Sequence, residues 1–283
     1  MSKGKSLILL AVVSCVWFGA TKTDPLCAKS KKLTVEEMVA KHLESLGTPE
    51  ALAAAKSRTV HGIVSVKRPI GVVPEFLPEL GKRTDPSNFT FASAEGKLSM
   101  IMKFYDLIYP GERFVFDGKD VLVSIVSSNR YSVLGEFVNS FSGLLREGLM
   151  GGTLSTAWPL LHVQEGKFKL KYDEANIDGT KYHQLTYTPK SRRHLDSIVV
   201  TLLFDFETFR HVMTEYKLMG IVYPTKMVIE QFGSYRQVDG VTLPHNYFIE
   251  YALFKDAHPT RWVVEVKQIS HGGEIDPALF QIK

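Results

Sequence analysis

The feature that most constrains the fold is a run of short alternating segments separated by tight-turn residues, shown most clearly by residues 237–254. There Asp239-Gly240 provides the residues that a two-residue hairpin turn favours. From Leu243 onward, apolar and polar side chains alternate with the period of a strand. Pro244 is compatible with a strand only at its first position or at a sheet edge. The segment therefore predicts half of a β-hairpin in a large antiparallel sheet.

Similar segments recur along the rest of the chain. Further turn dipeptides are found at Glu95-Gly96, Asp117-Gly118 and Asp178-Gly179, each between segments rich in β-branched and aromatic residues. Residues 166–173 alternate, with apolar side chains predicted inward and lysines outward. About ten or eleven strands joined by hairpins exclude a parallel sheet. They favour a mainly β protein with flanking helices, built as an incomplete, half-open antiparallel β-barrel or strongly curved sheet.

Two short helices are expected before the first strand. Thr34 followed three residues later by Glu37 is a capping box, and apolar residues recur at helical spacing until Gly47 ends the segment. Thr48-Pro49 begins a second, alanine-rich helix that extends to about residue 57. Both helices present one apolar face, so we expect them to pack on the sheet.

Residues 1–28 are predicted to be an export signal. Lys3 and Lys5 precede an apolar run at residues 6–20 that is short for a permanent membrane helix. Residues 12–15 (VVSC) resemble a bacterial lipobox, in which Cys15 would be acylated and become the new N-terminus. The alternative is an ordinary signal peptide cut between residues 20 and 28. Residues 29–32 are then a basic linker, and residues 33–283 form a single domain.

The composition narrows the classes of protein further. Cys15 and Cys27 both precede the first predicted element, so no disulfide framework can hold the fold. A net charge of +4 predicts no strong affinity for nucleic acid. The nine histidines are scattered without the paired spacing of a metal site, and no catalytic, phosphate-binding or dinucleotide motif is found. We therefore expect no enzyme activity, no cofactor and no metal.

One helical insertion, residues 132–161, interrupts the strands. Residues 133–149 follow helical spacing, and Gly151 and Gly152 separate this helix from a second apolar segment. The helix is either a permanent plug of the barrel or a lid over a lipid-binding cavity, with the two glycines as its hinge. Several strands are apolar on both faces, which favours a cavity over a filled barrel. The candidate cavity and lid residues are Leu134, Phe137, Phe141, Leu145, Trp158, Met102, Phe104, Leu202 and Phe204.

Together these features resemble the bacterial outer-membrane lipoprotein carrier superfamily of LolA and LolB. The resemblance rests on the export signal or lipobox, the N-terminal helices, the run of hairpins, the insertion, VDGVTLPH at residues 238–245 and IDPALF at residues 275–280. It implies an incomplete barrel closed by helices around an apolar cavity that takes up a lipid or lipoprotein acyl chain. It also implies a carrier or sorting protein in the periplasm, or anchored to the outer membrane and facing the periplasm. The alternative is a structural or interaction module with a filled barrel that binds another envelope protein.

Overall fold

The computed structural model describes residues 32–67, 87–104, 109–125, 130–165, 168–189, 197–219, 224–252 and 259–282. The chain divides into residues 1–32 and a compact unit of residues 33–283, and every element given below lies in that unit. Within the described ranges, none of the helices is both long enough and apolar enough to span a membrane. The export signal and Cys15 lie outside the described residues, so both remain predictions.

The two N-terminal helices form where the sequence predicts them. Helix α1 (Val35–Leu46) begins with the capping box, because the Thr34 hydroxyl accepts from the Glu37 N–H at 3.1 Å and the Glu37 carboxylate accepts from the Thr34 N–H at 2.8 Å. Helix α2 (Pro49–Ala54) is shorter than predicted. It ends before residue 57 because Ser57 already belongs to the first strand.

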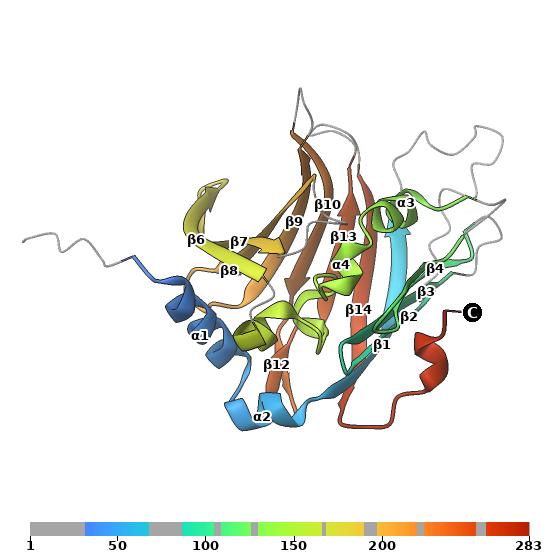
Figure 1. Ribbon diagram of the computed structural model, residues 1–283, viewed down its shortest axis with the longest axis horizontal. Helices are drawn as coiled ribbons and strands as arrows, with labels where there is room; N and C mark the ends of the chain where they lie inside the picture. The colour runs from blue at the N-terminus through green and yellow to red at the C-terminus, as the bar shows by residue number, and fades with distance from the viewer. Residues whose placement is uncertain are drawn as a thin grey trace, which may run out of the picture. The chain divides into compact units, whose positions relative to one another are not determined.

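Twelve strands form one antiparallel sheet, which confirms the predicted mainly β fold (Figure 1). Their order across the sheet is β5-β4-β3-β2-β1-β14-β13-β10-β9-β8-β7-β6. Among the described residues the edge strands β5 and β6 do not pair with each other, so the sheet is not closed into a barrel. The strands are β1 Ser57–Lys67, β2 Ser87–Ala94, β3 Lys97–Lys103, β4 Gly111–Phe116, β5 Val121–Val123, β6 Phe168–Ile177, β7 Thr180–Pro189, β8 Ile198–Asp205, β9 His211–Met219, β10 Pro224–Gly233, β13 Asn246–Tyr251 and β14 Thr260–His271.

The predicted hairpin turn at Asp239-Gly240 is confirmed, but the single strand predicted after it is wrong. Both turn residues have positive φ, 49° and 80°. They connect β11 (Arg236–Val238) to β12 (Val241–Leu243), which form a separate two-stranded sheet. Pro244, which has no N–H to donate, then ends the strand pairing before β13 begins at Asn246.

The insertion is two short helices and two 3-10 turns, so the prediction of one continuous helix is wrong. Helix α3 (Val133–Ser140) ends at Phe141, whose φ of −120° and ψ of 50° leave the helical region. Helix α4 (Gly143–Arg146) follows, then the 3-10 turns η1 (Gly152–Leu154) and η2 (Pro159–Glu165). The break falls at Phe141, directly before Ser142 and Gly143, the N-cap and the first residue of α4.

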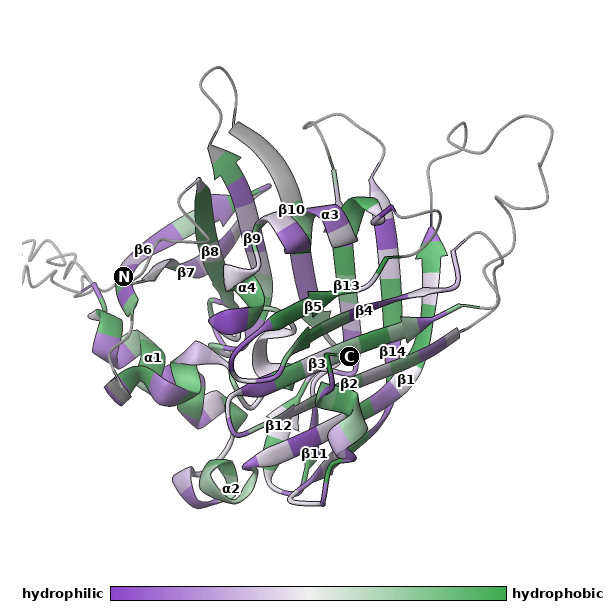
Figure 2. Ribbon diagram, turned by 45° about the vertical axis from the view of Figure 1, so that its right-hand side comes forward, coloured by the Kyte–Doolittle hydropathy of each residue, from purple (hydrophilic) through white to green (hydrophobic). Residues whose placement is uncertain are grey.

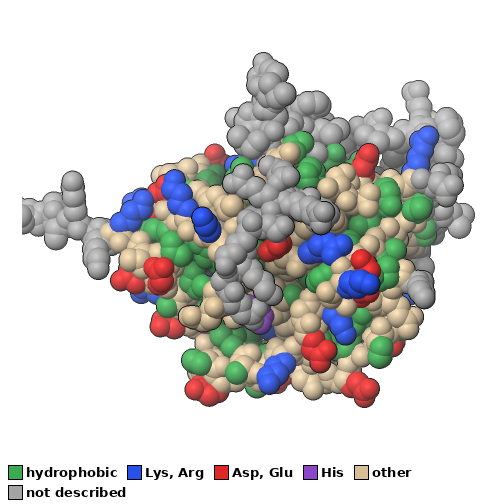
Figure 3. Space-filling view, in the orientation of Figure 1, with side chains coloured by type: hydrophobic (Ala, Val, Ile, Leu, Met, Phe, Trp, Pro, Cys, Tyr) green, Lys and Arg blue, Asp and Glu red, His purple; other side chains and the backbone are tan. Residues whose placement is uncertain are grey.

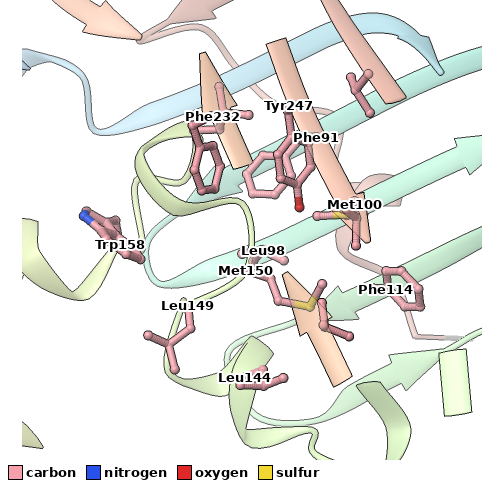
Figure 4. Packing of buried hydrophobic residues seen from close by; sticks show 14 of the residues in the cluster. Phe91, Leu98, Met100, Phe114, Leu144, Leu149, Met150, Trp158, Phe232 and Tyr247 are labelled. Atoms are coloured by element: carbon pink, nitrogen blue, oxygen red, sulfur yellow. The ribbon is translucent and has the colours of Figure 1, made fainter. Parts of the chain in front are cut away.

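The core lies between the sheet and the insertion. Hydrophobic and hydrophilic residues alternate along several strands, as Figure 2 shows, so these strands present an apolar row to one side. Figure 4 shows Leu144, Leu149, Met150 and Trp158 of the insertion beside Phe91, Leu98 and Met100 of the sheet. All of these side chains are at most 1% exposed, so the insertion and the strands both contribute to the core.

The end of the chain covers part of the outer face of the sheet. Asp276 caps the 3-10 turn η3 (Pro277–Phe280), which contacts β3 and β4. Arg113 Nη2, on β4, donates to the carbonyl oxygens of Ala278 at 3.1 Å and Gln281 at 2.6 Å. The IDPALF ending therefore has a structural role, because it shields one outer side of strands that are apolar on both faces.

Candidate functional site

The nine predicted cavity and lid residues belong to one continuous apolar cluster on the concave face of the sheet. Seven of them are at most 4% exposed, whereas Phe104 and Phe141 are half-buried. The seven are Met102, Leu134, Phe137, Leu145, Trp158, Leu202 and Phe204. The structure thus brings together residues that are far apart in the sequence. Their role in ligand binding remains a prediction.

The two predicted hinge glycines are tightly packed between the insertion and the sheet. Their φ angles of 80° and 48° are positive, which favours glycine. A Cβ atom on Gly151 would lie 2.6 Å from the Phe91 ring, and one on Gly152 would lie 2.7 Å from the Phe232 ring. Close packing therefore gives each position a reason to be glycine, and their role as a hinge stays a prediction.

A buried glutamate on the concave face holds this glycine segment, and the sequence analysis missed it. Glu230 of β10 is fully buried and accepts three hydrogen bonds. They come from the Gly151 N–H at 2.8 Å, the Tyr216 hydroxyl at 2.6 Å and the Tyr247 hydroxyl. Burial raises the pKa of the Glu230 carboxyl, and these three donors partly offset the rise. A lone acidic residue in the apolar row Val228-Glu230-Phe232 is the signal that could have revealed it.

A second buried glutamate holds the beginning of the insertion. Glu112 of β4 accepts from the Ser132 hydroxyl at 2.6 Å and from the Tyr109 hydroxyl, which in turn accepts from Trp262 Nε1 at 3.0 Å. The Ser132 oxygen also accepts from the Gly135 N–H at 2.8 Å and so caps α3. Carboxylates of the sheet thus hold the insertion at Ser132, before α3, and at Gly151, after α4.

Two buried histidines lie beside the insertion and are held neutral. His211 stacks on Trp158 at a ring-centroid distance of 4.8 Å, and His42 Nδ1 lies 2.9 Å from the Phe209 carbonyl oxygen. Burial lowers the pKa of His42 to about 4, and burial together with His42 lowers the pKa of His211 well below its usual value. In the described part of the chain, no group of three His, Cys, Asp or Glu side chains could hold a metal ion.

A pocket of about 470 Å³ lies beside the insertion, between the β2–β3 turn and the strands β6 and β7. We call it the seam pocket. Its lining comes from the β2–β3 turn, the end of α4, the 3-10 turn η2 with the segment before it, and strands β6 and β7. The side chains that matter below are Glu95, Arg146, Glu147, Ala157, Phe168 and Tyr187.

The seam pocket joins an aromatic wall to fixed charges. The rings of Phe168 and Tyr187 lie 4.9 Å apart, and the Tyr187 hydroxyl donates to Glu147 Oε2 at 2.6 Å. Burial and this carboxylate strongly raise the pKa of Tyr187. Arg146 Nη1 donates to the Lys119 carbonyl oxygen, and its guanidinium lies 5.7 Å from the centroid of the Phe116 ring. On the face seen in Figure 3, acidic and basic side chains are interspersed.

No family model and no curated protein matches this sequence. The structure is similar to that of the LolA superfamily protein NE2245 from Nitrosomonas europaea, with a TM-score of 0.52 and 15% identity over 88% of this chain and 98% of that chain. A DUF1329 family protein from Desulfovibrio piger ATCC 29098 aligns with a TM-score of 0.47 and 12% identity, over 87% of this chain and 97% of that chain. The first likeness confirms the predicted LolA-like fold, an open antiparallel sheet with a few helices.

Proposed function

We propose that this chain is a non-enzymatic protein of the bacterial envelope that binds a lipid or lipoprotein acyl chain on the concave face of its sheet, in a carrier or sorting role. The proposal rests on one observation: a continuous apolar surface, built from both halves of the sheet, is covered by the helical insertion and not by further strands. Such a surface gains about 0.8 kcal/mol for each methylene of an acyl chain that it buries.

The insertion is the part that an acyl chain would replace. Its helices span only eight and four residues, so they contain few internal hydrogen bonds. Besides apolar packing, hydrogen bonds with the side chains of Arg58, Ser93, Glu112, Tyr216 and Glu230 connect it to the sheet. Segments of this kind open locally at a lower free energy than the central strands of a sheet. Displacement of the insertion would therefore expose the apolar face without unfolding the sheet.

The envelope location follows from the N-terminal sequence. Residues 1–28 have the basic start and apolar run of an export signal. We propose that the protein works in the periplasm, either free or anchored to the outer membrane through an acylated Cys15. Replacement of Cys15 by Ala should release an anchored protein from the membrane fraction or leave its signal uncleaved. Identical behaviour of the variant and the wild type would contradict the anchor.

A second candidate function is a structural or interaction module of the envelope that binds another envelope protein and whose core is permanently filled. The packing of Gly151 against Phe91 and of Gly152 against Phe232 favours it, because these contacts are those of a well-packed core. In that case the insertion never leaves the sheet, and no lipid binds.

Lipid binding to delipidated protein separates the two candidates. Native mass spectrometry with phospholipid or fatty acid should show a bound lipid if the chain is a carrier. Displacement of the insertion should also move the fully buried Trp158 into a wetter environment and shift its fluorescence to longer wavelength. A Trp158→Phe variant, which should bind lipid without that shift, is the matched control. Absence of any bound lipid would contradict the carrier function.

A further inference from the structure

The seam pocket contains two opposite charges that do not neutralise each other. Arg146 ends helix α4 and Glu147 is the next residue, so the two side chains leave the backbone in different directions. In the described part of the chain, neither side chain forms an ion pair, with the other or with any third residue. Both nevertheless line the same pocket. A pocket with a cation and an anion in its wall is suited to a ligand that carries both charges.

Both charges are also held in place by contacts within the protein. The Tyr187 hydroxyl binds Glu147 Oε2, and no hydrogen bond from a described residue reaches the other oxygen, Oε1. The Lys119 carbonyl and the Phe116 ring hold one side of the Arg146 guanidinium. A guanidinium has five N–H donors, and the described residues accept from only one of its nitrogens. Each group is therefore oriented and still has capacity for a ligand.

The remaining wall of the pocket fits the carbon atoms next to an ammonium group. Phe168 and Ala157 contribute apolar surface, and an aromatic ring near an ammonium adds a cation–π attraction. Glu95 also lines the pocket, but its side chain is 84% exposed and Lys97 lies 3.9 Å away. The half-buried Glu147 is therefore the stronger acceptor for a cation.

We infer that the seam pocket binds a compact zwitterion, in which a phosphate and a primary ammonium are joined by a short carbon chain, as in phosphoethanolamine. Arg146 would bind the phosphate oxygens, and Glu147 would accept from the ammonium. The inference rests on the proposed function, because the same lipid would place its acyl chains on the concave face next to the pocket. It adds that the lipid is selected by its headgroup.

The test compares two phospholipids with the same acyl chains. The delipidated full-length protein is titrated with phosphatidylethanolamine and with phosphatidylglycerol, which keeps the phosphate and lacks the ammonium. We expect the first to bind about tenfold more tightly, the usual size of one hydrogen bond to a charged group. Glu147→Gln, which still accepts from Tyr187, should remove this preference, whereas Arg146→Gln should weaken binding of both lipids. Glu136→Gln, at an exposed position of α3 outside the pocket, should behave as the wild type does.

The outcomes separate this inference from the function on which it rests. Equal binding of both lipids, or a preference that survives Glu147→Gln, would overturn the headgroup inference and leave the carrier function standing. Failure of both lipids to bind would overturn the carrier function. Free phosphoethanolamine is the third ligand. If it binds in a manner that depends on Glu147 while neither lipid binds, the zwitterion chemistry holds and the source of the ligand is a small molecule.

Discussion

The inner and outer sides of the insertion differ in burial, although the short helix α4 contributes residues to both. On the inner side, Leu144 and Leu145 of α4 are fully buried against the sheet. On the outer side, Arg146 is exposed and Glu147 half-buried at the seam pocket. Neighbouring residues thus belong to a close-packed core and to a solvent-accessible site. The comparison teaches that substitutions on the inner side should change stability, whereas substitutions on the outer side should change binding.

The largest expected effect compares two apolar residues of the insertion. Leu145→Ala removes a fully buried side chain and should lower the free energy of unfolding by about 2 to 5 kcal/mol. Phe141 is half-buried, and its ring centroid lies 5.1 Å from that of Phe137, so Phe141→Ala should lower the free energy of unfolding by less. Urea denaturation measures both values. If the insertion is a lid, Phe141→Ala should instead change lipid binding. If both variants lose equally large amounts of stability and no variant binds lipid, the insertion is a plug.

The buried histidine of α1 should make the core sensitive to acid. The pKa of His42 falls from 6.5 to about 4 on folding, so the unfolded chain binds this proton more readily. The free energy of unfolding is therefore unaffected by this group above pH 6.5 and falls by about 3 kcal/mol as the pH is lowered to 4.

Urea denaturation at pH 7.5 and pH 4 checks the acid sensitivity. His42→Gln should lose less stability between the two pH values than the wild type loses. His61→Gln, at an exposed position of β1, is the control and should retain the wild-type difference. An unchanged pH dependence in His42→Gln would show that this histidine is not buried as described.

Two glycines with similar backbone conformations test the packing of the predicted hinge. Gly96 and Gly151 have φ angles of 76° and 80°, so alanine is strained at both. A Cβ atom meets nothing within 4 Å at Gly96 but lies 2.6 Å from the Phe91 ring at Gly151. Gly151→Ala should therefore lower the free energy of unfolding by about 1 to 3 kcal/mol more than Gly96→Ala does. Similar losses for the two variants would argue that the glycine segment moves away from the sheet, as a hinge would.

Helix caps and tight turns were the predictable parts of this fold. The capping box at Thr34 and the turn at Asp239-Gly240 form as predicted, because each depends on residues that are close in the sequence. The break of the insertion at Phe141 was not predictable from periodicity, because helical spacing of apolar residues continues across a short turn.

The site depends on contacts that sequence patterns do not contain. Glu230 binds Tyr216, Tyr247 and Gly151, which are 14, 17 and 79 residues away along the chain. The seam pocket likewise combines the β2–β3 turn with residues of β6 and β7. Residue types alone identified the apolar face. The charged groups that anchor and flank the insertion became visible only once the strands were placed in order.

The most direct test of the central claim is amide hydrogen exchange of residues 148–155, measured with and without phospholipid. If an acyl chain replaces the insertion on the concave face, exchange across this segment should become faster when lipid binds. The Gly151 N–H, which donates to Glu230 at 2.8 Å, should lose its protection, while strands β9 and β10 keep theirs. Lipid that binds, as native mass spectrometry would show, and leaves exchange of residues 148–155 unchanged or slower would contradict the account.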